Sequence, residues 1–486
     1  MKVLFAAVEM SPLAKVGGLG DVAGSLPRAL RALGADVRVA MPMHAGIERE
    51  SLHPTRVLQG VRVPWAGSEQ LVDVRQADVR GVPVYLLENG RFFDRPRVYG
   101  GDDDRERFLF YCDALLAAAP HLDFRPDVVH AQDWHAALLL ARLAAAPRHP
   151  WSGGGRVFTI HNLALRGDFD DRFARDHDID AASLAVPGGV APDLAFSAMA
   201  QGILHADRVN TVSQTYAAEI LTAAYGAGLD PLLRSRADVV SGIVNGIDYE
   251  EFDPATDPAI TRNYSVDTLE LRADDKVTLQ SEAGLPVSAQ TMLCGVVTRL
   301  FAQKGIDLVA GAFDRLLAAH DVQLVVLGTG DAEVEDMLSR LQAAYPSKVN
   351  VWLEFNPALG QRVYAGCDVF LMPSRYEPCG LGQLISLRYG AVPLVRRTGG
   401  LADTVQDAGP SPGSGTGFLF DDASAPALAG TVERALRAYV DHAAWRAIQQ
   451  RGMRQDWSWR RAAPQYLALY GLAIADRRRV AEEWPA

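Results

Sequence analysis

The sequence has fewer basic residues than acidic ones. Its 486 residues include 48 lysines and arginines against 59 aspartates and glutamates, which gives a formal net charge of −11. Nucleic acids and anionic membranes are bound through surplus positive charge over a long footprint, so we expect neither as a partner. A locally basic pocket for one small phosphate ligand is still compatible with this balance.

Cysteines are also few. The chain has four of them, Cys112, Cys294, Cys367 and Cys379, which lie far apart and form no CxxC pair. This spacing indicates reduced thiols, and it argues against a disulfide framework or a zinc site.

Long hydrophobic runs are absent. No stretch approaches the roughly eighteen apolar residues that are needed to span a bilayer. The apolar stretch in the opening "MKVLFAAVEMSP" is too short for a signal peptide, and Glu9 interrupts it. We therefore expect a cytoplasmic protein.

What the sequence does contain is a regular alternation of strand and helix patterns, which is typical of parallel α/β proteins. Strands are predicted at 2–9 and 36–43, with a helix over 21–34 between them. Residues 57–88 interrupt this rhythm with short strands joined by tight turns, which predicts an antiparallel insertion. A second series of strands and helices begins near residue 290, so we expect two doubly wound domains.

A glycine-rich segment, "KVGGLGDVAG" (15–24), follows the first predicted strand. It is not a dinucleotide fingerprint, because the glycines do not follow GxGxxG and the second strand ends in "AMPMH" without an acid. It is not a P-loop either, because Lys15 precedes the glycines. Two interpretations stay open. The segment is a tight strand–helix turn, or it is a flexible loop that approaches a diphosphate or a sugar, with Lys15 as a cation and Asp21 as a helix cap or hydroxyl partner.

Polar side chains follow several other predicted strands. They are His161 and Asn162 in "TIHN", Arg299 and Lys304 in "TRLFAQKG", and Glu377 in "SRYEPCGLGQ". Each can be explained alone as a cap, a satisfied core histidine or a solvated ion pair. Together they indicate more, because a guanidinium and an ammonium on one loop can neutralise a diphosphate, and helix N-termini add positive potential. The combination predicts a cleft that closes on a nucleotide-sugar.

These motifs, in this order, resemble those of bacterial glycogen synthases and plant starch synthases. The resemblance covers nearly the whole chain and rests on "KVGGLGDV", "RFFDRPRVYG", "PDVVHAQDWHAAL", "TIHNLA", "VNGIDYEEFDPATD", "TRLFAQKGIDL", "SRYEPCGLGQL" and "LVRRTGGLADTV". It implies an α/β protein of GT-B architecture, with two Rossmann-like doubly wound domains facing a central cleft. The implied parts are an acceptor-side domain at 1–244, a donor-nucleotide domain at 245–456, and a C-terminal helix at 457–486 that packs back on the first domain.

The resemblance also implies an activity and a set of site residues. The family consists of retaining glucosyltransferases (glycosyltransferase family 5) that move glucose from ADP-glucose to the non-reducing end of an α-1,4-glucan, glycogen or a maltooligosaccharide. By position, the catalytic residues are His161, Glu377, Arg299 and Lys304. The donor-binding residues are Lys15, Gly18, Asp21, Asn162, Asn245, Phe355, Cys379, Gly380 and Leu381, with Phe355 stacking on the base.

The implied chemistry needs no cofactor and no metal. The usual proposal is a same-face substitution, in which the leaving phosphate takes the acceptor's proton while Arg299 and Lys304 stabilise its charge. The acidic stretch at 101–106 could be mistaken for a metal site, and we interpret it as a solvated loop.

Five positions depart from the family pattern. Gln132 replaces a histidine, Leu165 and Arg166 replace a Tyr–Gln pair, Ala200 replaces a lysine, and Gly382 replaces a polar residue. All but Gly382 lie on the acceptor side, so we hypothesise that the acceptor, or the affinity for it, differs from ordinary glycogen.

Three alternatives follow from the residues. One is a glucosyltransferase of the same fold with another acceptor, and the second is a catalytically silent glucan-binding relative. The third, a nicotinamide dehydrogenase, is disfavoured by the missing acid and by the Arg299–Lys304 pair. The spacing of the motifs gives no preference between ADP and UDP.

Overall fold

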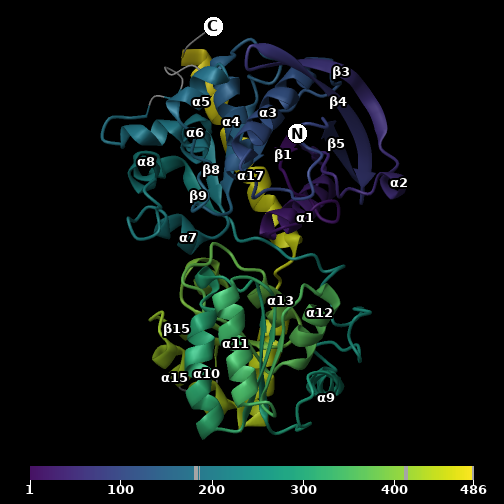
Figure 1. Cartoon of the computed structure of the whole chain (residues 1–486), viewed down its shortest axis with the longest axis vertical. Helices are drawn as coiled ribbons and strands as arrows, with labels where there is room; N and C mark the ends of the chain where they lie inside the picture. Colours follow the sequence, from purple (N-terminus) through teal and green to yellow (C-terminus); the bar gives the residue numbers. More distant parts are fainter. Residues whose placement is uncertain (180–183, 185, 410–413, 484–486) are drawn as a thin grey trace. The chain divides into compact units, whose positions relative to one another are not determined.

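The computed structural model describes residues 1–179, 184, 186–409 and 414–483. The chain divides into two compact units (Figure 1). Unit 1 contains Met1–Gly246 together with Trp459–Ala486, and unit 2 contains Ile247–Ser458. Within the described residues, no helix has the length and apolar character needed to cross a bilayer. All four cysteines are buried and none forms a disulfide, which confirms the prediction of thiols.

In the described part of unit 1, nine strands form one sheet in the order β3-β4-β5-β2-β1-β6-β7-β8-β9. Their bounds are β1 (Lys2–Ala6), β2 (Asp36–Pro42), β3 (Thr55–Trp65), β4 (Ser68–Val79), β5 (Val82–Glu88), β6 (Val128–Gln132), β7 (Gly155–Ile160), β8 (Arg208–Thr211) and β9 (Val240–Gly242). The β3–β4 and β4–β5 pairs are antiparallel, so the predicted antiparallel insertion is confirmed. It extends the parallel sheet, because β5 pairs in parallel with β2.

Two groups of helices pack in unit 1. The helices are α1 (Gly18–Ala32), α2 (Arg49–Leu52), α3 (Asp104–Ala118), α4 (Asp133–Ala145), α5 (Asp171–Asp176), α6 (Ala198–His205), α7 (Gln214–Glu219), α8 (Asp230–Ser235) and α17 (Trp459–Glu483). Helix α4 contacts α3 and α6, and α1 contacts α17. Gly202 permits the close approach of α6, because a Cβ there would lie 2.7 Å from the ring of Phe158 and 2.9 Å from Ala137 Cβ.

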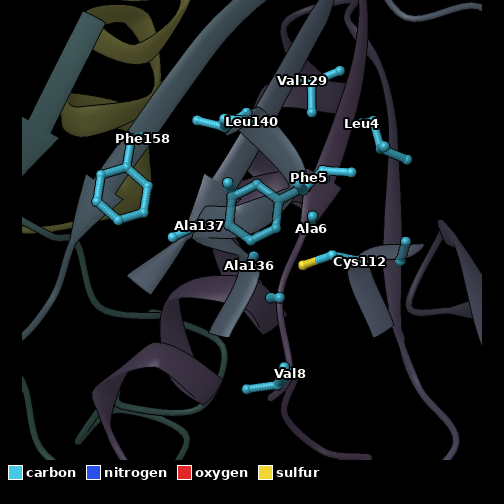
Figure 2. Close-up of a cluster of buried hydrophobic side chains, with 14 of the residues drawn as sticks. Leu4, Phe5, Ala6, Val8, Cys112, Val129, Ala136, Ala137, Leu140 and Phe158 are labelled. Atoms are coloured by element: carbon cyan, nitrogen blue, oxygen red, sulfur yellow. The ribbon is translucent and has the colours of Figure 1, made fainter. Parts of the chain in front are cut away.

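The core of unit 1 lies between the sheet and these helices. Figure 2 shows side chains from both meeting there: Leu4, Phe5 and Ala6 of β1, Val129 of β6, Phe158 of β7, Cys112 of α3, and Ala136, Ala137 and Leu140 of α4. Strands that are apolar on both faces, as β1 and β6 are, belong in the middle of a sheet that helices cover on both sides. The ends of these two strands are therefore held rigidly.

Helix α17 packs on unit 1 although it comes last in the chain. Figure 1 shows it, in yellow, running along the purple and blue elements of that unit. Its buried face includes Tyr470, whose hydroxyl lies 2.9 Å from Nδ1 of His130 on β6. Arg477 pairs with Asp207 at 2.6 Å, so ionic as well as apolar contacts dock the helix.

In the described part of unit 2, six strands form a wholly parallel sheet in the order β12-β11-β10-β13-β14-β15. They are β10 (Met292–Val297), β11 (Val322–Leu327), β12 (Val349–Trp352), β13 (Val369–Met372), β14 (Val392–Arg396) and β15 (Phe418–Phe420). The helices are α9 (Arg272–Glu282), α10 (Ile306–Ala319), α11 (Ala332–Ala344), α12 (Pro357–Gly366), α13 (Gly382–Arg388), α14 (Gly399–Thr404), α15 (Ala425–Tyr439) and α16 (His442–Met453). Helix α10 contacts α11 and α15, whereas α12 contacts α9 and α13. The prediction of two α/β domains with parallel sheets is confirmed.

The strand orders place each unit's ligand-binding edge. In unit 1 the order reverses at β1, which lies between β2 and β6, and in unit 2 it reverses at β10, between β11 and β13. In open α/β sheets, ligands bind beyond the carboxyl ends of the strands at such a reversal. The predicted site residues of unit 1 that follow β1 and β7, and those of unit 2 that follow β10 and β13, lie at these edges.

Candidate active site

The glycine-rich segment of unit 1 is mostly helix. Gly18 opens α1, and Gly20 and Gly24 lie inside it. A Cβ at Gly24 would lie 2.6 Å from the carbonyl oxygen of Ser11, so glycine is needed for the preceding turn to pack against the helix. Of the two interpretations left open by the sequence, the tight strand–helix turn is confirmed. The approach of this segment to a diphosphate or a sugar stays a prediction, and at Gly18 an added Cβ would meet no other atom within 4 Å.

Glu9 is a residue that the sequence reasoning missed. Its side chain is buried, and its Oε2 accepts hydrogen bonds from the backbone N–H groups of Val16 at 2.6 Å and Gly17 at 2.8 Å. These two donors of the turn are therefore occupied by a carboxylate of the protein itself. The available signal was an acidic residue directly after a buried strand, in front of a glycine turn.

Lys15 and Asp21 form an ion pair with a separation of 2.6 Å between Nζ and Oδ1. Asp21 does not cap α1, since Gly17 is the N-cap and Asp21 lies in the first turn of the helix. Burial raises the pKa of Asp21, and the nearby Lys15 offsets part of that rise. The lysine side chain is 40% exposed, so its ammonium can still meet a ligand.

Two consecutive residues at the end of β6 hold His161. The Oδ1 atom of Asp133 accepts hydrogen bonds from the backbone N–H groups of His161 at 2.7 Å and Asn162 at 3.3 Å. The side-chain Oε1 of Gln132 lies 2.8 Å from Nε2 of the His161 ring. Burial lowers the pKa of His161 to about 3 and raises that of Asp133 to about 7. Asp133 was not among the predicted site residues. It adopts a left-handed backbone with φ of 53°, an uncommon conformation for a non-glycine residue.

Asn245 follows β9 at the end of the first part of unit 1. Its side chain is buried, and its Oδ1 has no hydrogen-bond partner within the described residues. An unpaired buried acceptor costs free energy unless water or a ligand satisfies it. This atom is therefore a candidate contact for a ligand hydroxyl. Asn162 differs, because its own Oδ1 already accepts a bond from the Ala164 N–H at 3.1 Å.

In unit 2 the structure brings two of the predicted catalytic residues together. The Oε2 atom of Glu377 lies 2.6 Å from Nζ of Lys304 and accepts a hydrogen bond from Ser374 Oγ at 2.9 Å. Glu377 is only 5% exposed, whereas the side chain of Lys304 is 17% exposed. The carboxylate therefore fixes the ammonium at the edge of β13 while leaving part of it open to solvent.

Two further predicted residues of unit 2 are exposed. Arg299 lies beyond β10, with its guanidinium 5.5 Å from the ring centre of Phe301, and no carboxylate of the described chain pairs with it. Phe355 lies beyond β12 with 84% of its surface exposed. A free cation and a bare aromatic ring suit a phosphate and a flat base.

The turn of Cys379, Gly380 and Leu381 leads into α13. Gly380 has φ of +75°, a left-handed conformation that favours glycine. The Gln383 side chain fixes the turn, because its Nε2 donates to the carbonyl oxygens of Cys379 at 3.0 Å and Gly380 at 2.9 Å. Two of the backbone carbonyls are thereby committed to the protein.

The acidic stretch at 101–106 is only partly the solvated loop that we predicted. Asp104 is buried and begins α3. Its carboxylate accepts a hydrogen bond from the Gly100 N–H at 2.6 Å and pairs with Arg107 at 2.6 Å. These contacts compensate for its removal from solvent. Nowhere in the described chain do three histidine, cysteine, aspartate or glutamate residues gather as a metal cluster.

The departures in unit 1 are accommodated locally. Arg166 pairs with Asp168 and donates to the Ala227 carbonyl oxygen, and Leu165 is half exposed beside it. Ala200 is fully buried in α6, where a lysine would have to carry its charge out of the core.

Gly382 has a packing reason. A Cβ there would lie 3.0 Å from the ring of Phe370 and 3.3 Å from Met372 Sδ. We expect Gly382→Thr to lower the free energy of unfolding by about 1–3 kcal/mol, because the ring cannot move away freely. Thermal unfolding measures this, with Gly430→Ala on the open side of α15 as the control. That control should raise stability slightly. A Gly382→Thr protein as stable as the parent would contradict the prediction.

Comparison with known proteins gives consistent matches. Residues 2–235 match the starch synthase catalytic domain family, and residues 285–451 match the family of group 1 glycosyl transferases. A glycogen synthase of Moorella thermoacetica is 44% identical, over 98% of this chain and 98% of its own length. Glycogen synthase 2 of Geobacter sulfurreducens is also 44% identical, over 99% of this chain and its full length.

Solved structures agree with these matches. The catalytic domain of starch synthase IV from Arabidopsis thaliana, bound to ADP and acarbose, superposes with a TM-score of 0.90 at 30% identity. The match covers 98% of this chain and 99% of that one. A sucrose-phosphate synthase from Thermosynechococcus elongatus, at 17% identity and a TM-score of 0.61, covers 98% of this chain and 99% of its own and shares the fold.

Proposed function

The chain belongs to the glycogen synthase family of glucosyltransferases, and we propose that it transfers glucose from ADP-glucose to the non-reducing end of an α-1,4-glucan. The starch synthase relative was solved with ADP and acarbose, which supports a nucleotide-sugar donor and a glucan acceptor. The chain is acidic overall, but binding such a donor requires only a few basic side chains, and unit 2 provides Arg299 and Lys304.

The observation that carries the proposal is the contact between Lys304 and Glu377. An ammonium fixed 2.6 Å from a buried carboxylate needs no reorganisation when charge develops next to it. We assign the diphosphate to Lys304 and Arg299, and the turn at Cys379, Gly380 and Leu381 to phosphate and hydroxyl contacts. Phe355 stacks on the base.

In unit 1 the proposed roles concern the sugar. His161, Asn162 and Asn245 bind the glucose hydroxyls, with the unpaired Oδ1 of Asn245 as an acceptor. Lys15, in the turn before α1, and its partner Asp21, in the first turn of that helix, approach the donor together with Gly18.

The proposed reaction retains the anomeric configuration. The bond between the anomeric carbon and the phosphate oxygen breaks, and the acceptor 4-hydroxyl oxygen bonds to that carbon from the same face. The hydroxyl proton passes to the departing phosphate. A double displacement would need a free carboxylate nucleophile. Glu377 is poorly suited to that role, since its Oε2 already accepts bonds from Lys304 and Ser374.

The test is nucleoside diphosphate release from ADP-glucose and from UDP-glucose, each with glycogen, with short maltooligosaccharides and without acceptor. Glycogen-dependent ADP release is the expected result. A rate of nucleoside diphosphate release that does not depend on glycogen, or a preference for UDP-glucose, would overturn the proposed substrates. The same assay tests the hypothesis that the departures at Gln132, Leu165, Arg166 and Ala200 alter the acceptor, which predicts a weaker response to glycogen than to another glucan.

Removal of the exposed ring tests the base contact. We expect Phe355→Ala to raise the KM for ADP-glucose by about fivefold to tenfold, because aromatic stacking contributes about 1 kcal/mol. The kcat should change little, since the base takes no part in bond exchange. Leu353→Ala is the matched control, as Leu353 is exposed on the same segment. An equal effect of the two variants on KM would contradict the stacking role.

A further inference from the structure

We propose that Gln132 fixes the position of the proton on the His161 ring and is thereby a positioning residue for glucose transfer. The inference rests on the proposed function and concerns one residue of this chain that nothing else assigns.

The location of Gln132 makes it suited to this role. It is the last residue of β6 and the N-cap of α4, and its side chain is fully buried. In the register of the sheet it lies opposite Thr159 of β7, two residues before His161. The Gln132 side chain reaches from the end of β6 to the residue that follows β7 and places its Oε1 2.8 Å from the His161 Nε2. The rotamer of a fully buried side chain at a helix start has little freedom.

The chemistry of the amide determines the tautomer. An amide oxygen only accepts hydrogen bonds, so the Nε2 of a neutral His161 must carry the proton in this contact. Nδ1 is then bare and can only accept, for instance from a sugar hydroxyl. Asp133 holds the backbone N–H of His161, whereas Gln132 holds its ring. Asp133 thus positions the main chain of His161, and Gln132 positions its side chain.

The surroundings keep the ring uncharged. The ionisable groups near His161 are Asp133, which bonds to its backbone, and the buried His130 and His135. Burial lowers the pKa of His161 to about 3, and the neutral Gln132 does not counteract this as a carboxylate would. A neutral ring adds no positive charge beside a sugar that becomes cationic in the transition state.

The first test is Gln132→Glu, which keeps the size and the acceptor but adds a negative charge. A carboxylate at this position stabilises the imidazolium, so the pKa of His161 should rise and protonation should remove its acceptor. We expect the kcat of this variant to fall by up to about tenfold per pH unit below that raised pKa. The kcat of the parent should show no such decrease over the same pH range. The KM for ADP-glucose should stay within about twofold, as the diphosphate and base contacts are untouched.

A matched control exists in unit 2. Oε1 of Gln290 lies 3.2 Å from Nε2 of His442, and both residues are exposed. Gln290→Glu places the same charge beside a histidine outside the site and should leave the pH profile of kcat unchanged. A pH-dependent loss in both variants would show an effect of charge alone, and it would overturn the inference.

Nitrogen NMR of the complete protein with labelled histidines gives a readout that does not depend on activity. We expect a protonated Nε2 and a bare Nδ1 at His161, assigned with His161→Asn, and a loss of the single tautomer in Gln132→Met. A proton on Nδ1 in the parent means that the amide is turned the other way, which overturns the inference. So does a folded Gln132→Glu protein with the parent's pH profile.

The outcomes separate this inference from the proposed function. A parent protein without glycogen-dependent ADP release contradicts the function but leaves the NMR result on the tautomer standing. An active parent in which neither the NMR signal nor the pH profile responds to Gln132 contradicts this inference alone.

Discussion

Replacing Lys304 with methionine should lower kcat for glucose transfer by about a hundredfold to a thousandfold, the loss typical of removing one preorganised electrostatic donor. Methionine fills a similar volume but has no charge to offer a departing diphosphate. The substitution also leaves Glu377 buried with Ser374 as its remaining side-chain donor. Steady-state release of ADP measures the loss, and we expect KM to change much less than kcat.

The double variant Lys304→Met/Glu377→Gln separates the two consequences of this change. A buried carboxylate without its positively charged partner costs about 3–5 kcal/mol of stability, and the neutral glutamine at position 377 should restore most of it. If Lys304 stabilises the leaving group, the double variant becomes stable but stays inactive. Recovery of activity would mean that Lys304 serves only as a counter-charge. Arg446→Met, at an exposed ion pair with Glu270, is the control for the loss of a cation.

The sequence was most informative where periodicity and strand ends determine position. Alternating patterns predicted both parallel sheets, and His161 was singled out because polar residues directly after buried strands collect at the ligand-binding edge. Glu377 was singled out because it precedes the turn that opens the next helix. The antiparallel insertion was readable from its tight turns, although its strands β3 and β4 are longer than predicted, at 11 and 12 residues. These features depend on a few neighbouring residues, which a single sequence displays.

The pairings were not readable, because they join residues from different loops. Lys304 and Glu377 lie 73 positions apart, and nothing local shows that one holds the other. The packing role of Gly24 was not readable either, since its partner Ser11 becomes a neighbour only when the turn packs on the helix. Asp133 was overlooked for the same reason, as its carboxylate bonds to the backbone of another segment.

Asp133 should make stability depend strongly on pH, and Asp133→Asn should remove that dependence. Burial raises its pKa from 3.8 to about 7, so the folded protein binds a proton that the unfolded chain releases. Stability from this group is therefore full below about pH 4 and is lost as pH rises toward 7, at up to about 1.4 kcal/mol per unit. At pH 8 the ionised carboxylate costs about 4 kcal/mol at most.

Asparagine avoids this cost and keeps the geometry. Its Oδ1 can still accept from the His161 N–H, and asparagine tolerates the left-handed backbone that residue 133 adopts. Denaturant unfolding of Asp133→Asn should therefore show a gain over the parent that is largest at pH 8 and shrinks to almost nothing near pH 4. Asp123→Asn, at an exposed aspartate of the same unit, should show no such trend.

An Asp133→Asn protein that is less stable than the parent at pH 8 would contradict this prediction. It would mean that the bonds from the two backbone N–H groups to the charged Asp133 stabilise the fold by more than the burial of that charge costs. The ionised carboxylate would then stabilise the turn that carries His161.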